Sequence, residues 1–434
     1  MKITTLFFAI VFCTGILSCK KTFINPNAPE IDPLLKTPEG MVQLLVGIKN
    51  RFAVNSNYGN GAVFNSITAN GFSSNEINLK AGGNQDFGQL AAGRNTIATN
   101  NVVLTELWSN CMLINNYSTM LLDNVDQVAQ DSGMKINILK YAYLYKALSI
   151  GMLANYWKEF PVSTGTNASF VSKNDGLKRA ISFLETAVLL PTKSAPPEYS
   201  VYFGSEININ NTCNALLARY YNMLGDSIKA VEKASKVILN NRSVFIYNAQ
   251  NTNPLYRSGY TFVFGYTPKG GFGLPASLAP SPADARIAFY LVPQGPQGQP
   301  PGFGFGKTDF DSIPIFLPGE MLLIQAEAYV RRNDLINGKK FLDSVLRKKN
   351  VEDVFRVGAN LPAYSGPLDS ASLMKEIYKN RCIELFLSGM KLEDGRRFRR
   401  PGPTDPNSER TRDWYPYPLV ERNGNPNTPS DPLY

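Results

Sequence analysis

Apolar side chains recur at helical spacing through most of this chain. Ile138, Tyr141, Tyr145, Leu148 and Met152 fall three or four residues apart, which places them on one face of a helix. An earlier helix is predicted after the capping pair Thr37-Pro38, and Pro191 is expected to end another that carries Leu177 to Val188. Further helices are predicted at residues 99–130, 212–224, 226–239, 319–332, 335–349 and 371–392. The pattern therefore predicts a mainly α protein.

Two long segments lack this period and are predicted to be irregular. Residues 58–93 are rich in Gly, Asn and Ser, and residues 240–318 contain a Gly/Pro/Gln tract between Pro293 and Gly306. Tyr260 to Phe264 could form a short strand, and prolines around Trp414 favour an extended C-terminal segment. Long connections inside a domain are often functional, so their aromatic residues are candidates for a binding surface.

Some of the predicted helices form antiparallel pairs. The helices at 212–224 and 226–239 are separated only by Gly225-Asp226, and small residues such as Ala215, Ala218 and Ala234 allow close packing. These pairs resemble tetratricopeptide units, although insertions interrupt the period of roughly 34 residues.

The N-terminus has the organisation of a secretory signal. Lys2 precedes an apolar run from Leu6 to Phe12, and the small residue Ser18 stands directly before Cys19. This arrangement resembles a bacterial lipobox, in which the cysteine is acylated and anchors the chain to a membrane. The alternative is an ordinary cleaved signal with an incidental cysteine. Residues 20–37, rich in Pro and Asn, are predicted to be an extended tether.

Composition excludes several kinds of chemistry. The chain has no histidine, so Ser-His-Asp, Cys-His and His-zinc sites are excluded, whereas catalysis by carboxylates alone is not.

Cys111, Cys213 and Cys382 each lie in an apolar helical pattern and are predicted to be buried free thiols. The net charge of +9 is mostly scattered, so a nucleic-acid partner is not expected. No catalytic residue, metal or cofactor is predicted.

Several motifs occur in one collinear order. They are Glu106-Leu107-Trp108 with Ile114-Asn115-Asn116, Arg219-Tyr220-Tyr221 with Gly225-Asp226, Asp284-Ala285-Arg286, Glu320 to Ala328, Arg381 to Leu385, Asp394 to Arg397, and Asn425-Pro426-Asn427. Together they resemble the SusD/RagB family of surface glycan-binding lipoproteins of Bacteroidetes, over nearly the whole mature chain. The helix from Glu320 to Ala328 is the most specific single match.

The resemblance implies a SusD-like fold: tetratricopeptide-like helical repeats with long irregular loop insertions. It divides the chain into a signal peptide (1–18), a lipidated tether (19–37), an N-terminal helical region (38–240) and a C-terminal region (241–434) with a loop insertion at 241–318. It also implies an outer-membrane lipoprotein, facing the cell surface, that captures an oligosaccharide for a SusC-like TonB-dependent transporter.

The candidate ligand-binding residues come from the two irregular regions and the tail: Phe87, Arg94, Tyr260, Tyr266 and Trp414. Asn253 and Arg257 are possible hydrogen-bond donors beside the two tyrosines. The alternative for each aromatic residue is that it pins a loop to the helical body. The charged motif residues are predicted to be structural: Glu320, Glu327, Arg381, Glu384, Asp394, Arg396 and Arg397.

Two other functions remain open at this point. One is a surface hydrolase that uses paired carboxylates, for which the loop acids are Glu76, Asp86, Asp309 and Asp311. The other is a helical-repeat scaffold that binds only protein.

Overall fold

The computed structural model describes residues 31–54, 61–80, 84–258, 265–291 and 304–434. The signal segment, Cys19, most of the tether and Tyr260 lie outside these ranges. Within them, no helix has both the length and the apolar character required to cross a bilayer.

The helices predicted from apolar periodicity are present. They are α3 (Pro38–Ala53), α6 (Val102–Val128), α7 (Ser132–Tyr156), α8 (Lys173–Leu189), α10 (Ile209–Leu224), α11 (Ser227–Ser235), α14 (Pro318–Arg331), α15 (Leu335–Arg347) and α16 (Ser370–Glu384). Shorter helices are α2 (Ile31–Leu34), α9 (Pro197–Phe203), α12 (Pro254–Tyr256), α13 (Arg286–Tyr290), α17 (Lys391–Arg397) and α18 (Leu419–Gly424). The last few residues of the predicted tether thus contain a turn of helix, and α18 interrupts the predicted extended tail.

Local sequence sets the ends of the long helices. The Thr37 hydroxyl accepts a hydrogen bond from the Gly40 N–H at 3.1 Å, and the Asp131 carboxylate accepts one from Met134 at 2.7 Å. Gly225 ends α10 in the left-handed conformation, with a φ of 81°, which is readily adopted only without a Cβ. Asp226 then caps α11, so the pair reverses direction within two residues.

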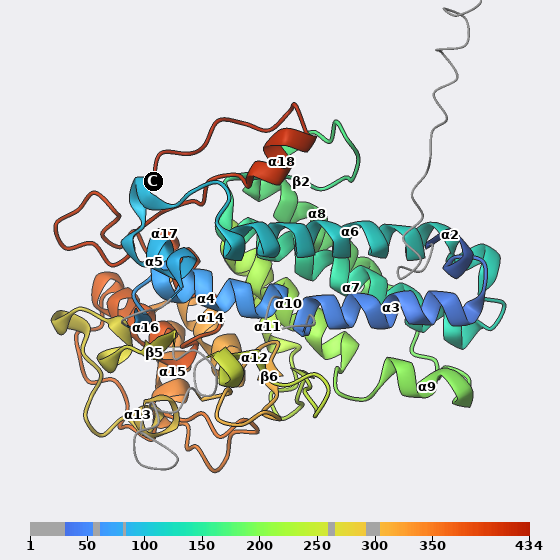
Figure 1. Cartoon of the computed structure of the whole chain (residues 1–434). Coiled ribbons are helices and arrows are strands. Elements are labelled where there is room, and N and C mark those ends of the chain that lie inside the picture. The colour runs from blue at the N-terminus through green and yellow to red at the C-terminus, as the bar shows by residue number, and fades with distance from the viewer. Residues whose placement is uncertain (1–30, 55–60, 81–83, 259–264, 292–303) are drawn as a thin grey trace, which may run out of the picture.

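Neighbouring helices pack in an array that follows the chain order. α3 packs on α6, α6 on α7, α7 on α8, α8 on α10, α10 on α11, and α11 on α14, which also packs on α15 and α16 (Figure 1). Close approach within the array needs small residues: a Cβ at Gly151 of α7 would lie 2.0 Å from the hydroxyl of Tyr220 on α10. Cys111, Cys213 and Cys382 are buried free thiols, as predicted.

The prediction that residues 58–93 form a loop is wrong for most of this segment. It contains α4 (Ala62–Ser73), β1 (Ile77–Leu79) and α5 (Gln85–Ala92). Every residue of α4 is buried, its Asn and Ser residues included. A helix enclosed on all sides has no polar face, so the apolar period that identifies a surface helix is absent.

Three small antiparallel pairs connect distant segments. β1 pairs with β5 (Tyr266–Pro268), β2 (Glu159–Pro161) with β3 (Phe170–Ser172), and β4 (Val244–Phe245) with β6 (Ile313–Pro314). The β1–β5 register places Leu79 opposite Tyr266. This pair therefore brings the two regions proposed as a ligand surface next to each other. Short 3-10 turns lie at Arg94–Thr96, Gly270–Gly273 and Ala276–Leu278.

The single helix predicted at 371–392 is instead two helices. α16 ends at Glu384, and α17 starts at Lys391 after Leu387 and Gly389 adopt positive φ values of 56° and 80°. The Tyr156 hydroxyl donates a hydrogen bond of 2.8 Å to the Gly389 carbonyl, which fixes the reversal against α7.

The C-terminal segment is bound to the helical array by tryptophan N–H groups. Trp157 Nε1 donates to the Pro416 carbonyl and Trp108 Nε1 to Glu421, both at 3.0 Å. Both tryptophans are buried, as expected for residues of a helical stripe. In Figure 1 the part of this segment that contains α18 lies above α6, next to β2.

Candidate functional site

The aromatic residues predicted to bind a ligand pack against the protein itself. Phe87 of α5 lies 5.0 Å from Phe72 and 5.9 Å from Tyr266, measured between ring centroids. Tyr266 is only 1% exposed, so its ring is not accessible to a ligand in this structure. Tyr266 instead pins its loop to the helical body, by packing on Phe72 and Phe87. Phe87 is half-buried and keeps part of its ring at the surface.

Arg94 is exposed, but its contacts are to the C-terminal segment. Its Nε donates to the Pro403 carbonyl at 2.9 Å and its backbone N–H to Thr411 at 3.0 Å, while its own carbonyl accepts from Arg412. Arg94 thus joins the end of α5 to the tail, and the structure does not bring it to Tyr266 as a donor.

Trp414 is half-buried and lies close to two cations. The Arg396 guanidinium carbon is 3.8 Å from the centroid of its ring, and Lys173 Nζ is 5.8 Å away. Because Arg396 occupies one face, at most the other face of the indole remains for a ligand.

Asn253, a proposed ligand donor, is buried and organises a loop. Its Nδ2 donates to the carbonyls of Phe305 and Asp311 at 2.8 and 2.7 Å, and its Oδ1 accepts from Leu255 and Tyr256. Arg257 forms an ion pair of 2.7 Å with Asp309. The prediction that Asn253 faces a ligand is therefore wrong: a short polar side chain beside Pro254 satisfies the backbone of its own loop.

The charged motif residues form buried ion-pair networks. Glu384 pairs with Arg286 at 3.1 Å and also contacts Lys348, while Glu320 pairs with Arg219 at 2.6 Å. These contacts join α16 to the 284–286 segment and α14 to α10.

A second network surrounds Arg397, which contacts Glu327, Glu393 and Asp394, and Asp394 also accepts from Arg381 at 2.9 Å. Burial by itself raises the pKa of Glu393, but attraction to Arg397, Lys173 and Arg396 lowers it to about 2. Arg396 donates to the carbonyls of Asp413 and Asn155, both at 2.6 Å. Glu384 and Asp394 belong to different networks and do not form a carboxylate pair.

The loop acids are also engaged in structural contacts. Asp86 accepts from the Val102 N–H at 3.0 Å, Asp309 pairs with Arg257, and Asp311 accepts from Lys307 and Thr308. Each of the three acids therefore already has a hydrogen-bond or ion-pair partner in the protein.

Glu76 is the loop acid with a displaced pKa. Burial raises its pKa to about 7, against the opposing attraction of Lys391. A carboxyl group with such a pKa can mark a catalytic acid, but Glu76 is completely buried and contacts Asn70 and Leu387. Within the described ranges, no three His, Cys, Asp or Glu residues are grouped so that they could hold a metal ion.

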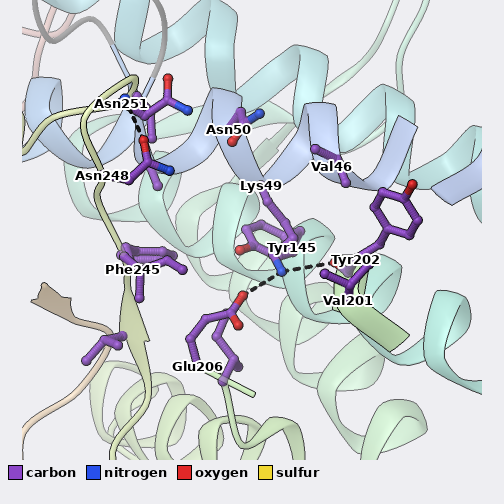
Figure 2. A pocket seen from close by; sticks show the side chains of 15 residues that line it. Val46, Lys49, Asn50, Tyr145, Val201, Tyr202, Glu206, Phe245, Asn248 and Asn251 are labelled. Carbon is purple, nitrogen blue, oxygen red and sulfur yellow. Dashed lines mark hydrogen bonds and ion pairs between the residues drawn. The ribbon is translucent and has the colours of Figure 1, made fainter. Parts of the chain in front are cut away.

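A defined pocket of about 340 Å³ lies between α3, α9 and the segment that follows β4 (Figure 2). We call it the α3–α9 pocket. Its lining residues are Val46, Lys49, Asn50, Ala53, Val54, Tyr145, Val201, Tyr202, Glu206, Ile207, Val244, Phe245, Ile246, Asn248 and Asn251.

None of these residues was a candidate from sequence. In the sequence, Lys49 and Asn50 have the pattern of the solvent-exposed side of an amphipathic helix. Most of the residues that complete the pocket lie about 150 to 200 positions further along the chain. The only local signal was the polar, Asn-rich stretch between Asn248 and Asn253.

Two other hollows have less favourable linings. One, of about 820 Å³, lies along α15 and is lined mostly by charged side chains, of which Lys339 and Lys349 pair with Asp343 and Glu352 in the same wall. The other, of about 340 Å³, is lined in part by residues 203–210 and includes Lys140, which donates a hydrogen bond to Asn210.

Comparison with known proteins gives matches only among solved structures: no family model matches the sequence, and no curated protein matches it. A SusD superfamily protein from Bacteroides vulgatus is 14% identical, with a TM-score of 0.69 over 92% of this chain and 100% of that chain. A SusD-like carbohydrate binding protein from the same species is 16% identical, with a TM-score of 0.65 over 84% of each chain. A SusD homolog from Bacteroides thetaiotaomicron is 11% identical, with a TM-score of 0.66 over 94% of this chain and 99% of that chain.

At these identities the likeness concerns the fold. It extends over nearly the whole chain and agrees with the mostly helical array, the paired helices and the irregular insertions described above. The resemblance inferred from the sequence motifs is thus confirmed at the level of structure: this chain has the SusD-like fold.

Proposed function

We propose that this protein is a non-catalytic glycan-binding lipoprotein on the outer membrane, facing the cell surface, that delivers oligosaccharide to a SusC-like TonB-dependent transporter. The observation that carries this proposal is the likeness of nearly the whole chain to SusD-like structures, one of which is described as a carbohydrate binding protein. The lipobox-like Cys19 supports the anchoring, and the collinear motifs support the transporter partner.

The environment of the acids supports binding without hydrolysis. A glycosidase needs two carboxyl groups that face the same bound sugar, roughly 5–10 Å apart. Here Glu76 is buried, and Asp86, Asp309 and Asp311 accept hydrogen bonds or pair with an arginine of their own loop region. The acids of the C-terminal motif are buried in ion-pair networks.

The loop surface near α5 remains a proposed contact region for the glycan. Phe87 is half-buried and Arg94 is exposed at this surface, and Trp414, whose ring lies near Arg396 and Lys173, is a further candidate with at most one free face. Sugar rings present apolar C–H faces to such rings and hydroxyl groups to such donors.

A glycan array with the purified chain lacking residues 1–19 tests this function. We expect saturable binding to a subset of oligosaccharides, and the bound sugars are expected to keep their chain length after prolonged incubation. Binding to no glycan, together with capture of a protein partner, would favour the helical-repeat scaffold. Shortened products that disappear on mutation of a loop acid would favour the hydrolase.

The Cys19→Ala variant tests the anchor. The acyl chains of a lipoprotein are attached through this thiol, so its removal should move the protein from the membrane fraction to the soluble fraction. Cys13→Ala is the matched control and should remain with membranes, because bulky Phe12 precedes that cysteine. Retention of Cys19→Ala in the membrane fraction would contradict the assignment.

A further inference from the structure

The α3–α9 pocket has two chemically different ends. Figure 2 shows Asn50, Asn248 and Asn251 close together at one end, and Lys49, Glu206 and Tyr202 at the other. The rings of Tyr145 and Phe245 are buried and close the pocket on the side of the core. Four chain segments, α3, α7, residues 201–207 and residues 244–251, thus place amides, an ion pair and apolar walls around one cavity.

The amide end offers unused hydrogen-bonding groups. The side chains of Asn50 and Asn251 make no hydrogen bond within the described part of the protein, although both line the pocket. Asn248 uses its Oδ1 to accept from the backbone of Gln250 and Asn251, at 3.0 and 2.9 Å, which holds the loop and leaves its Nδ2 as a donor. An amide both donates and accepts, as a hydroxyl group does, so the two are complementary.

The charged end is already neutralised. Lys49 Nζ lies 2.6 Å from Glu206 Oε1 and also donates to the carbonyls of Phe203 and Tyr202, at 3.1 and 3.4 Å. These three bonds use all the protons of the ammonium group. A charged ligand would gain no net attraction from this pair, and a carboxylate ligand could bind Lys49 only by displacing one of its partners. The pocket therefore favours a neutral ligand.

The walls add apolar surface without closing the pocket. Val201 is 75% exposed, Ile246 55% and Tyr202 37%, so three apolar or aromatic side chains stand at the mouth. The volume of about 340 Å³ is near the lower end of the range of roughly 300–1,000 Å³ for ligand pockets, which suits one or two sugar rings.

We propose that the α3–α9 pocket binds one or two neutral sugar units of the glycan, through the amides of Asn50 and Asn251 at one end and the ring of Tyr202 at the other. This inference rests on the proposed glycan-binding function and adds a subsite apart from the loop surface near α5. We expect the Lys49–Glu206 pair to make the pocket prefer neutral sugars to uronic acids, because the paired charges offer no net attraction to a carboxylate.

Calorimetric titration of the pocket variants tests the proposal. The probes are neutral gluco-, manno-, galacto- and xylo-tetraoses, with tetragalacturonate as the acidic counterpart. Asn50→Ala, Asn251→Ala and Tyr202→Ala remove surface side chains without internal hydrogen bonds, so each should keep the wild-type melting temperature. Each is expected to weaken binding of a neutral tetraose by about threefold to tenfold. Asn423→Ala, an exposed asparagine of α18, is the matched control and should bind as the wild type does.

The possible outcomes separate this inference from the function on which it rests. If a neutral tetraose binds the wild type and all three pocket variants equally well, the subsite is wrong and glycan binding stands; a loss confined to Phe87→Ala would then place the site near α5. If the pocket variants weaken only tetragalacturonate, the choice of a neutral ligand is wrong. If no glycan binds the wild type, the proposed function fails, and this inference fails with it.

Discussion

Replacing Asp394 with alanine is expected to lower the free energy of unfolding by about 3–5 kcal/mol, the usual cost of removing one partner from a buried ion pair. Asp394 is buried at the junction of α16 and α17, where it accepts from Arg381 and Arg397. Among the residues that the structure describes, Arg381 Nη1 has no hydrogen-bond partner, so the substitution leaves a buried guanidinium with even less compensation. Urea unfolding followed by circular dichroism measures the effect.

The exposed pair Lys349–Glu352 supplies the control for this experiment. Both side chains are more than half exposed, so Glu352→Ala should change stability by no more than about 0.5 kcal/mol. Asp394→Ala should also bind glycan normally at temperatures where it is folded. Wild-type stability combined with lost binding would instead place Asp394 in the ligand site.

Replacing Arg286 with methionine is expected to be similarly costly, again by about 3–5 kcal/mol. Arg286 is fully buried and donates to Asp284, Glu384 and Asn380, at 2.7–3.1 Å. Methionine fills much of the same volume but leaves the buried carboxylates of Asp284 and Glu384 without this cation, although Lys348 still contacts Glu384. Thermal and urea unfolding should both report the loss.

Arg257→Met is the matched control, because it removes an arginine from a partly exposed pair with Asp309. We expect a change of at most about 1 kcal/mol. Equal stability losses in Arg286→Met and Arg257→Met would contradict the view that burial of the ion pair, and not the pair itself, sets the cost.

Helices such as α8 and α15 could be predicted because each has one buried and one exposed face. The stripe from Ile138 to Met152 identified α7, and Thr37 marked the start of α3. α4 was missed because it is buried on every side and therefore lacks a period. The break between α16 and α17 was missed because it depends on Gly389 and on the distant hydroxyl of Tyr156.

The candidate site was harder to predict from sequence. Aromatic residues in Gly- and Pro-rich segments looked accessible, but β1–β5 pairing encloses Tyr266 between Phe72 and Phe87. The α3–α9 pocket is assembled from residues as distant as Val46 and Asn251, and the Asn-rich stretch around Asn251 does not by itself indicate a cavity. Tertiary packing alone determines which polar side chains remain unpaired.

Binding calorimetry on an oligosaccharide selected by the array tests the central claim most directly, when the sugar is recovered afterwards and its chain length is measured. The account predicts saturable binding to the purified chain and recovery of the oligosaccharide at its original length. An absence of saturable binding to this oligosaccharide, or recovery of shortened products, would contradict it.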